Sequence, residues 1–117
     1  MNPKSPAKKL LQYFFPWRGQ KLVERLADEI ALQCKADLWQ RISPEVGEMG
    51  IAEARGYAGA LAVGYVESEM SRTPSCHELN PALRMGVLRL AADKLVGMSV
   101  RELLLTDFSA DPEILAA

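Results

Sequence analysis

Apolar residues recur at steps of four through the first half of the chain. Between Arg18 and Ile42 they form one stripe made of Leu22, Leu26, Ile30, Cys34, Leu38 and Ile42. This spacing is typical of an amphipathic α-helix. Because four residues turn a helix by about 400°, the stripe advances about 40° at each step and does not keep the 3.5-residue repeat of a coiled coil. We predict a long helix from Arg18 or Gly19 to Ile42, and no zipper.

The next apolar stretch, Arg55–Val66, has no charged residue after its opening arginine. In a helix, one ridge of this stretch is small and the neighbouring ridge is bulky. The small ridge consists of Ala52, Gly56, Ala60 and Gly64, and the bulky ridge of Tyr57, Leu61 and Tyr65. Each helical glycine costs about 1 kcal/mol relative to alanine, so the glycines indicate a close approach of another backbone. The alternative is a short strand at 61–66 with the glycines in loops.

Capping signals set the expected limits of this second helix. Ser43-Pro44-Glu45 offers an N-cap, a proline at the first position and an acid near the positive end of the helix dipole. We therefore predict a helix from this signal to about Ser71, with a kink near Gly47 or Gly50. Residues 72–80 are predicted to form a loop.

Similar signals divide the C-terminal third of the chain. Asn80-Pro81 repeats the cap-and-proline start, and predicts a third helix that ends around Gly97. Ser99–Glu102 fits a capping box, which opens a short helix through about Leu105. Asp111-Pro112-Glu113 predicts one more short turn.

The stretch from Leu90 to Leu104 resembles the helix-turn-helix of bacterial regulators over about fifteen residues. Gly97 and Ser99 fall at the turn positions of that motif. However, Asp93 stands where a small residue is expected, and the second helix is largely apolar, with a single arginine. Because an apolar helix does not read bases, we interpret the pattern as an ordinary helical corner and assign no family from it.

These patterns predict an all-α fold: a compact bundle of about four helices around a Gly/Ala-rich central helix. A helix that is apolar on every side is normally enclosed, and a chain of 117 residues has few helices to enclose it. We therefore predict a homodimer formed through this helix or its neighbours. The interface candidates are Gly56, Tyr57, Ala60, Leu61, Gly64 and Tyr65. We expect Glu53, Arg55, Glu67 and Glu69 to be its solvated ends, or to pair across a two-fold axis.

Composition and charge narrow the class of protein. The chain is 49% apolar and 25% charged, as in ordinary soluble globular domains. Its net charge is −1, but the first 21 residues carry five cations and no acid, so residues 22–117 carry −1 minus 5, or −6. We divide the chain into a basic, aromatic N-terminal arm at 1–17, a helical domain at 18–110 and a short turn or tail at 111–117.

No apolar run approaches the roughly 20 residues that span a bilayer. The apolar segment Leu10–Phe15 follows lysines, but it is too short for a signal peptide and has no small-residue cleavage site. Cys34 and Cys76 lie far apart and suggest no disulfide framework. We expect a cytoplasmic protein.

The N-terminal arm is the first candidate for binding chemistry. Its candidate residues are Lys8, Lys9, Tyr13, Phe14, Phe15, Trp17 and Arg18. Large apolar side chains are usually buried, so we favour an arm that folds back over the helical core or a partner chain. The alternatives are an anionic membrane, with lysines at the headgroups, and single-stranded nucleic acid, held by phosphate contacts and base stacking.

Cys76, His77 and Glu78 place a nucleophile, a base and a carboxylate side by side in the sequence. Catalytic Cys/His pairs meet in space and not by adjacency, and a zinc site needs further ligands at set spacings. The chain has one histidine and one other cysteine. We therefore predict no catalytic residue, no metal ligand and no cofactor, and treat an enzyme or metal site at Cys76/His77 as a minor alternative.

The sequence supports three functional hypotheses. The first is a small, non-catalytic helical interaction or regulatory protein, homodimeric, that binds an unknown partner protein. The second is a peripheral binder of anionic membrane or nucleic acid through the basic arm. The third is the enzyme at Cys76/His77.

Overall fold

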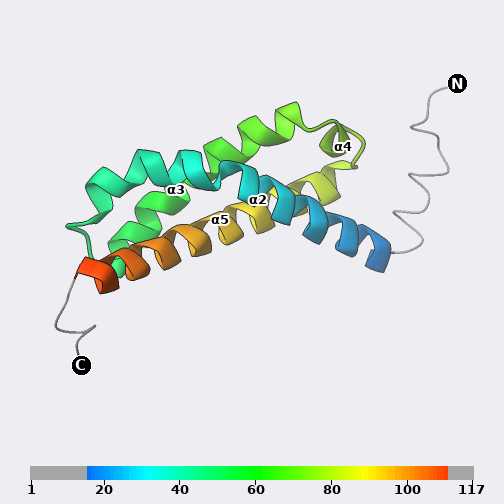
Figure 1. Cartoon of the computed structure of the whole chain (residues 1–117). Helices are drawn as coiled ribbons and strands as arrows, with labels where there is room; N and C mark the ends of the chain where they lie inside the picture. Colours follow the sequence, from blue (N-terminus) through cyan, green and yellow to red (C-terminus); the bar gives the residue numbers. More distant parts are fainter. Residues whose placement is uncertain (1–15, 111–117) are drawn as a thin grey trace, which may run out of the picture.

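The computed structural model describes residues 16–110, and these residues form four α-helices without a strand. The helices are α2 (Pro16–Val46), α3 (Ile51–Arg72), α4 (Pro74–His77) and α5 (Pro81–Ala110) (Figure 1). The Gly/Ala-rich helix α3 packs against each of the other three. The predicted all-α bundle around this helix is therefore confirmed.

Helices α2 and α5 run in the same direction (Figure 1). A Cβ added at Gly86, near the start of α5, would lie 3.5 Å from Cγ1 of Val23 on α2. Further along both helices, Lys35 Nζ lies 3.3 Å from a carboxylate oxygen of Glu102. The pairs ascend together in sequence, so the first residues of α2 and of α5 lie at the same end of the bundle.

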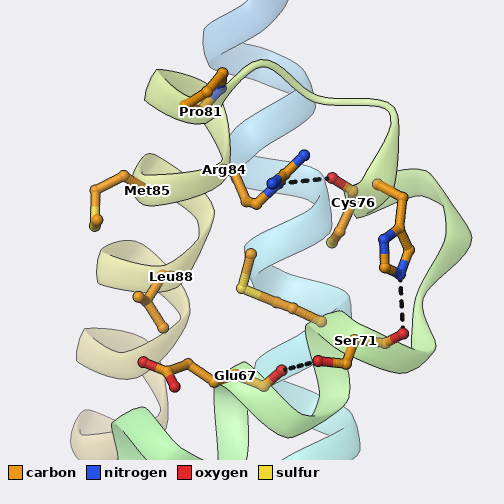
Figure 2. A pocket seen from close by; sticks show the side chains of 9 residues that line it. Glu67, Ser71, Cys76, Pro81, Arg84, Met85 and Leu88 are labelled. Carbon is orange, nitrogen blue, oxygen red and sulfur yellow. Dashed lines mark hydrogen bonds between the residues drawn. The ribbon is translucent and has the colours of Figure 1, made fainter.

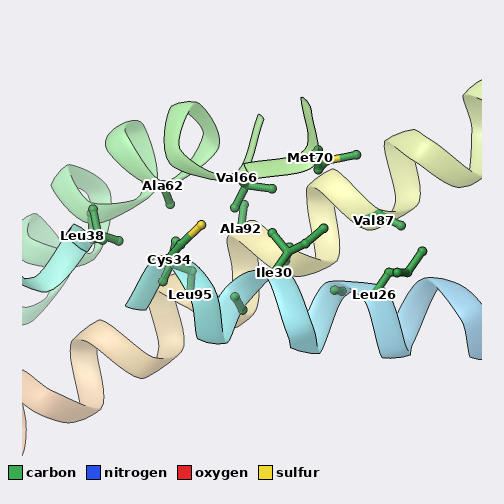
Figure 3. Packing of buried hydrophobic residues seen from close by; sticks show 14 of the residues in the cluster. Leu26, Ile30, Cys34, Leu38, Ala62, Val66, Met70, Val87, Ala92 and Leu95 are labelled. Atoms are coloured by element: carbon green, nitrogen blue, oxygen red, sulfur yellow. The ribbon is translucent and has the colours of Figure 1, made fainter. Parts of the chain in front are cut away.

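Helix α3 runs antiparallel to both and buries a ridge at steps of four. The ridge consists of Ala54, Ala58, Ala62, Val66 and Met70. Three small alanines in succession let α3 approach its neighbours closely, and Figure 3 shows Ala62 and Val66 above the apolar side chains of α2. The helical interpretation of the Gly/Ala-rich stretch is thus confirmed over the strand alternative.

The predicted apolar stripe of α2 forms one side of the hydrophobic core. Its members Leu26, Ile30, Cys34, Leu38 and Ile42 are all buried, and Leu22 is half-buried. Figure 3 shows Leu26, Ile30 and Cys34 on the side of α2 that faces the other helices, with Val87 and Leu95 of α5 among the buried side chains. The stripe stabilises α2 mainly by burial, since helical stability in proteins comes largely from packing an apolar face.

The prediction of a helix start at Ser43-Pro44-Glu45 is wrong. Helix α2 continues through Pro44 to Val46, and α3 begins only at Ile51. Proline removes one backbone hydrogen bond of the helix. However, Ile42 and Val46 lie one turn apart on the buried face, at 1% and 2% exposure, so continuing the helix keeps both in the core.

The prediction of a plain loop at residues 72–80 is also wrong, because Pro74–His77 form the short helix α4. Pro74 occupies the first turn, where its missing N–H is no loss. The hydroxyl of Thr73 donates a hydrogen bond to the carbonyl of Glu69, at 2.8 Å, and so closes the end of α3.

At the next boundary the prediction is confirmed. The Leu83 N–H donates a 2.9 Å hydrogen bond to Oδ1 of Asn80, which is the N-cap interaction expected before Pro81. The predicted end near Gly97 and the new start at Ser99 are wrong, since α5 runs unbroken to Ala110. Leu103 is buried on the same face as Leu95, and this apolar face runs past the glycine without a break in the helix.

No helix within residues 16–110 is both long enough and apolar enough to cross a membrane.

Candidate functional site

The outer face of α3, which we define as Ala52, Gly56, Ala60 and Gly64, is exposed along its length. A Cβ added at Gly56 or at Gly64 would meet no heavy atom within 4 Å. The small ridge predicted from the sequence therefore exists, but no other part of the described chain packs against it. The tight packing inferred from its glycines is not made among residues 16–110 of one chain.

The bulky ridge lies on another side of the same helix. Tyr57, Leu61 and Tyr65 are each half-buried and pack against the core. The hydroxyl of Tyr57 donates a hydrogen bond to the Glu45 carboxylate and accepts one from Nη1 of Arg41, at 3.2 Å. The carboxylate acceptor holds the phenol in its neutral form and raises the pKa of Tyr57. The six interface candidates thus separate into an inward, bulky set and an outward, small set.

Charged side chains flank the outer face. Glu53, Arg55 and Glu67 are exposed. Within the described residues none of the three takes part in an ion pair, whereas Glu69 pairs with Arg72 at 2.7 Å. The outer face therefore ends in charges of both signs.

A second surface feature is an open pocket of about 500 Å³ where α3, α4 and α5 meet. Figure 2 shows its walls. The lining residues are Glu67, Met70, Ser71, Cys76, His77, Pro81, Arg84, Met85 and Leu88. A volume of this size falls within the range in which proteins bury ligands or single apolar side chains of a partner.

The pocket is apolar in the middle and polar at the edges. Met70, Met85 and Leu88 are its apolar lining, and Figure 2 shows Leu88 between Arg84 at one edge and Glu67 at the other. Arg84 donates hydrogen bonds to the backbone carbonyls of Leu79, at 3.0 Å, and Cys76, at 3.4 Å. The arginine thus ties α5 to the connection that carries α4, and shapes that edge of the pocket.

Cys76 and His77 both line this pocket. Cys76 is buried, and burial raises the pKa of its thiol. The Nε2 atom of His77 lies 2.9 Å from the carbonyl oxygen of Ser71, its only hydrogen-bond partner within the described residues. In that part of the chain no three His, Cys, Asp or Glu side chains are grouped closely enough to hold a metal ion.

The arm candidates fall largely outside the described residues. This applies to Lys8, Lys9, Tyr13, Phe14 and Phe15. Trp17 and Arg18 belong to the first turn of α2.

Sequence reasoning missed the pocket residues Met70, Arg84 and Met85. The residues that line the pocket come from three helices, so no single periodic pattern in the sequence identifies them. One signal in the sequence could have indicated the pocket. The short connection predicted at residues 72–80 places the end of one helix beside the start of the next, and the pocket lies between these two ends.

Comparison with known proteins adds no relative. The chain matches no protein-family model, no curated protein and no solved structure.

Proposed function

We propose that this protein is a small, non-catalytic helical interaction protein that forms a homodimer through the outer face of α3 and holds a partner protein. One observation carries the proposal: two exposed glycines, Gly56 and Gly64, lie in the middle of a helix with open space beyond them.

The energetic argument concerns why glycine is present at these positions. Within one chain an alanine would fit at either position, and would favour the helix by about 1 kcal/mol. The described residues of one chain, 16–110, therefore offer no packing reason for Gly56 and Gly64. A second helix backbone lying along the outer face supplies one, because only small residues let two backbones come close.

Two-fold symmetry gives this contact a definite geometry. If the axis passes near Ala60, Gly56 of one copy lies opposite Gly64 of the other, since most soluble homodimers are isologous. The same arrangement brings Arg55 near Glu67 of the second copy. These are the charges that have no ion-pair partner within the described part of one chain.

Light scattering after size exclusion tests the dimer with the double variant Gly56→Leu, Gly64→Leu. Both positions are exposed, and an added Cβ at either meets no described atom within 4 Å, so the variant should fold and elute as a monomer while the parent elutes as a dimer. Gly97→Leu on α5 is the matched control, because that helical glycine is also exposed with no atom within 4 Å of an added Cβ. A monomeric parent, or a variant that remains dimeric, would overturn the proposed interface.

The charge of the arm supports a second candidate function. Five cations and no acid stand in the first 21 residues, against −6 in the rest of the chain. This distribution favours binding to an anionic membrane or to nucleic acid. Flotation with anionic vesicles and titration with single-stranded oligonucleotides test it. Such binding should weaken steeply as salt rises, whereas apolar contact with a protein should not.

A further inference from the structure

The pocket between α3, α4 and α5 has an apolar lining that the described residues leave open to solvent. Met85 is 48% exposed, and Leu88 is half-buried. Met70, at 8% exposure, lines the pocket from α3. The volume of about 500 Å³ falls within the range of protein sites that bind small molecules. Unbranched methionine side chains adapt their shape to what they contact, so this lining suits a hydrocarbon group.

Arg84 supplies a positive charge at one edge of the pocket. Its Nε donates a hydrogen bond to the carbonyl of Cys76, at 3.4 Å, and its Nη2 donates one to the carbonyl of Leu79, at 3.0 Å. These acceptors are neutral, so they orient the guanidinium without neutralising its charge. None of the ion pairs formed within residues 16–110 includes Arg84. An oriented guanidinium is the group that proteins most often use to bind a carboxylate in a defined geometry.

The opposite edge of the pocket carries a negative charge. Glu67 lines the pocket there, and Figure 2 shows Leu88 between Glu67 and Arg84. A carboxylate near Glu67 would be repelled by a like charge, whereas a carboxylate near Arg84 is attracted. The two charges therefore favour one orientation of an acidic ligand, with its carboxylate at the Arg84 edge and its apolar part over Leu88.

We propose that this pocket binds a small apolar monocarboxylate, an aliphatic or aromatic acid whose carboxylate pairs with Arg84. Its hydrocarbon part contacts Met70, Met85 and Leu88. No residue of the outer face of α3 lines the pocket. The ligand site is therefore separate from the proposed dimer contact.

Titration of the parent protein with octanoate and with 1-octanol tests the carboxylate. The two probes have the same chain length, and only octanoate can form an ion pair with Arg84. Octanoate should bind several-fold more tightly than 1-octanol at neutral pH. Equal affinity for the two probes, or no binding of octanoate at millimolar concentration, would overturn the proposal.

Methionine methyl resonances locate the probe in the parent protein. Octanoate should shift the methyl signals of Met70 and Met85, which line the pocket. The signals of Met49 and Met98, which do not line it, are the internal control and should stay in place. Binding that leaves the Met70 and Met85 signals unchanged would place octanoate elsewhere and contradict the proposed site.

Charge variants at the two edges test the orientation. Arg84 is exposed, so solvent screens its ion pair, and we expect Arg84→Gln to weaken octanoate binding about fivefold. Binding of 1-octanol should stay the same, which would show that the pocket still forms without the hydrogen bonds of Arg84. Glu67→Gln is the matched control, since it removes a charge at the other edge and should not weaken octanoate binding. Equal losses in the two variants would contradict the orientation.

The proposed dimer and the ligand site fail separately. The double variant Gly56→Leu, Gly64→Leu changes the outer face of α3 and no residue that lines the pocket. It should bind octanoate as tightly as the parent, whatever its mass in solution. Loss of octanoate binding in this variant would assign the site to the dimer contact and overturn the placement in the pocket.

Discussion

The thiol of Cys34 on α2 donates a hydrogen bond to the backbone carbonyl of Tyr65 on α3, with the sulfur 3.5 Å from the oxygen. This contact turns the Tyr65 side of α3 toward α2. Since Gly56 and Gly64 lie on the other side of the helix, they face outward, where the proposed second copy would bind. This contact and the buried ridge that contains Ala62 and Val66 place one side of α3 against the core and leave the glycine ridge free.

The same thiol predicts a pH dependence of stability. Burial, with a smaller contribution from the Glu69 and Asp37 carboxylates, raises the pKa of Cys34 from 9.0 to about 11. The folded state thus favours the neutral thiol more than the unfolded chain does. The stabilisation is present below pH 9 and is lost as pH rises from about 9 toward 11.

Denaturant unfolding of the parent and of Cys34→Ala measures this effect. The free energy of unfolding of the parent should fall more steeply between pH 8.5 and about 10.5 than that of the variant. Tyrosine ionisation is common to both proteins and cancels in the difference. Parallel curves for the two proteins would mean that Cys34 titrates normally.

Cys76 should be slow to alkylate. Burial raises the pKa of its thiol, although the nearby Arg84 guanidinium lowers it in part. The thiolate is the reactive form, and Cys76 is only 2% exposed. We expect iodoacetamide to modify it more slowly than a model thiol at pH 8, and at the model rate in denaturant, with the site read by peptide mass spectrometry. A faster rate in the folded protein would revive the enzyme hypothesis.

Pro44→Ala should stabilise the protein. Pro44 lies inside α2 and is exposed, so alanine restores a helix hydrogen bond without removing a core contact. Pro44 is two residues from the end of the helix. We therefore expect the free energy of unfolding to rise by about 1 to 2 kcal/mol, which is less than the roughly 3 kcal/mol that a proline costs in the middle of a helix. Urea unfolding measures the difference. A loss of stability would mean that the helix ends before Pro44 in solution.

Periodicity predicted where the helices lie, and local capping signals predicted their ends less well. Ser43-Pro44 and Gly97–Ser99 both look like boundaries. At each, buried apolar residues on either side of the signal, Ile42 with Val46 and Leu95 with Leu103, lie on one continuous face. Burial of these side chains outweighs a lost hydrogen bond or a helical glycine. Among the predicted caps within residues 16–110, only Asn80, which has no apolar face continuing through it, caps a helix as predicted; the signal at Asp111 lies outside the described residues.

The candidate surfaces also have one part that the sequence predicts and another that depends on how the helices pack. The ridge containing Gly56 and Gly64 follows from helical spacing alone. Its direction depends on packing, because the sequence is apolar on every side of α3 and gives no polar face to mark the outside. The pocket at Met85 required the relative placement of three helices, which no local pattern contains.

Gly97→Ala tests the continuity of α5. The glycine is exposed within the helix, and an added Cβ meets nothing within 4 Å. Alanine should therefore stabilise the protein by about 1 kcal/mol, since it fits and has the higher helix propensity. If the chain instead turned at Gly97, as the capping signals suggest, alanine would destabilise it. Thermal and urea unfolding show whether the variant is more or less stable than the parent.

Ser99→Ala should also stabilise the protein, for a different reason. The Ser99 side chain is 2% exposed, and its hydroxyl has no hydrogen-bond partner within the described residues. The void beside it, lined by Trp39 and Ala58 among others, is too small to hold a water molecule.

A buried hydroxyl without a partner costs about 1 to 3 kcal/mol, so its removal should raise the free energy of unfolding by about 1 kcal/mol or more. Ser68→Ala, at an exposed position of α3, measures the gain in helix propensity that the same change brings on the surface. The gain at Ser99 should exceed the gain at Ser68. An equal or smaller gain would show that the Ser99 hydroxyl is hydrogen-bonded in the folded protein, and that α5 packs less closely against α2 and α3 at this level than the void indicates.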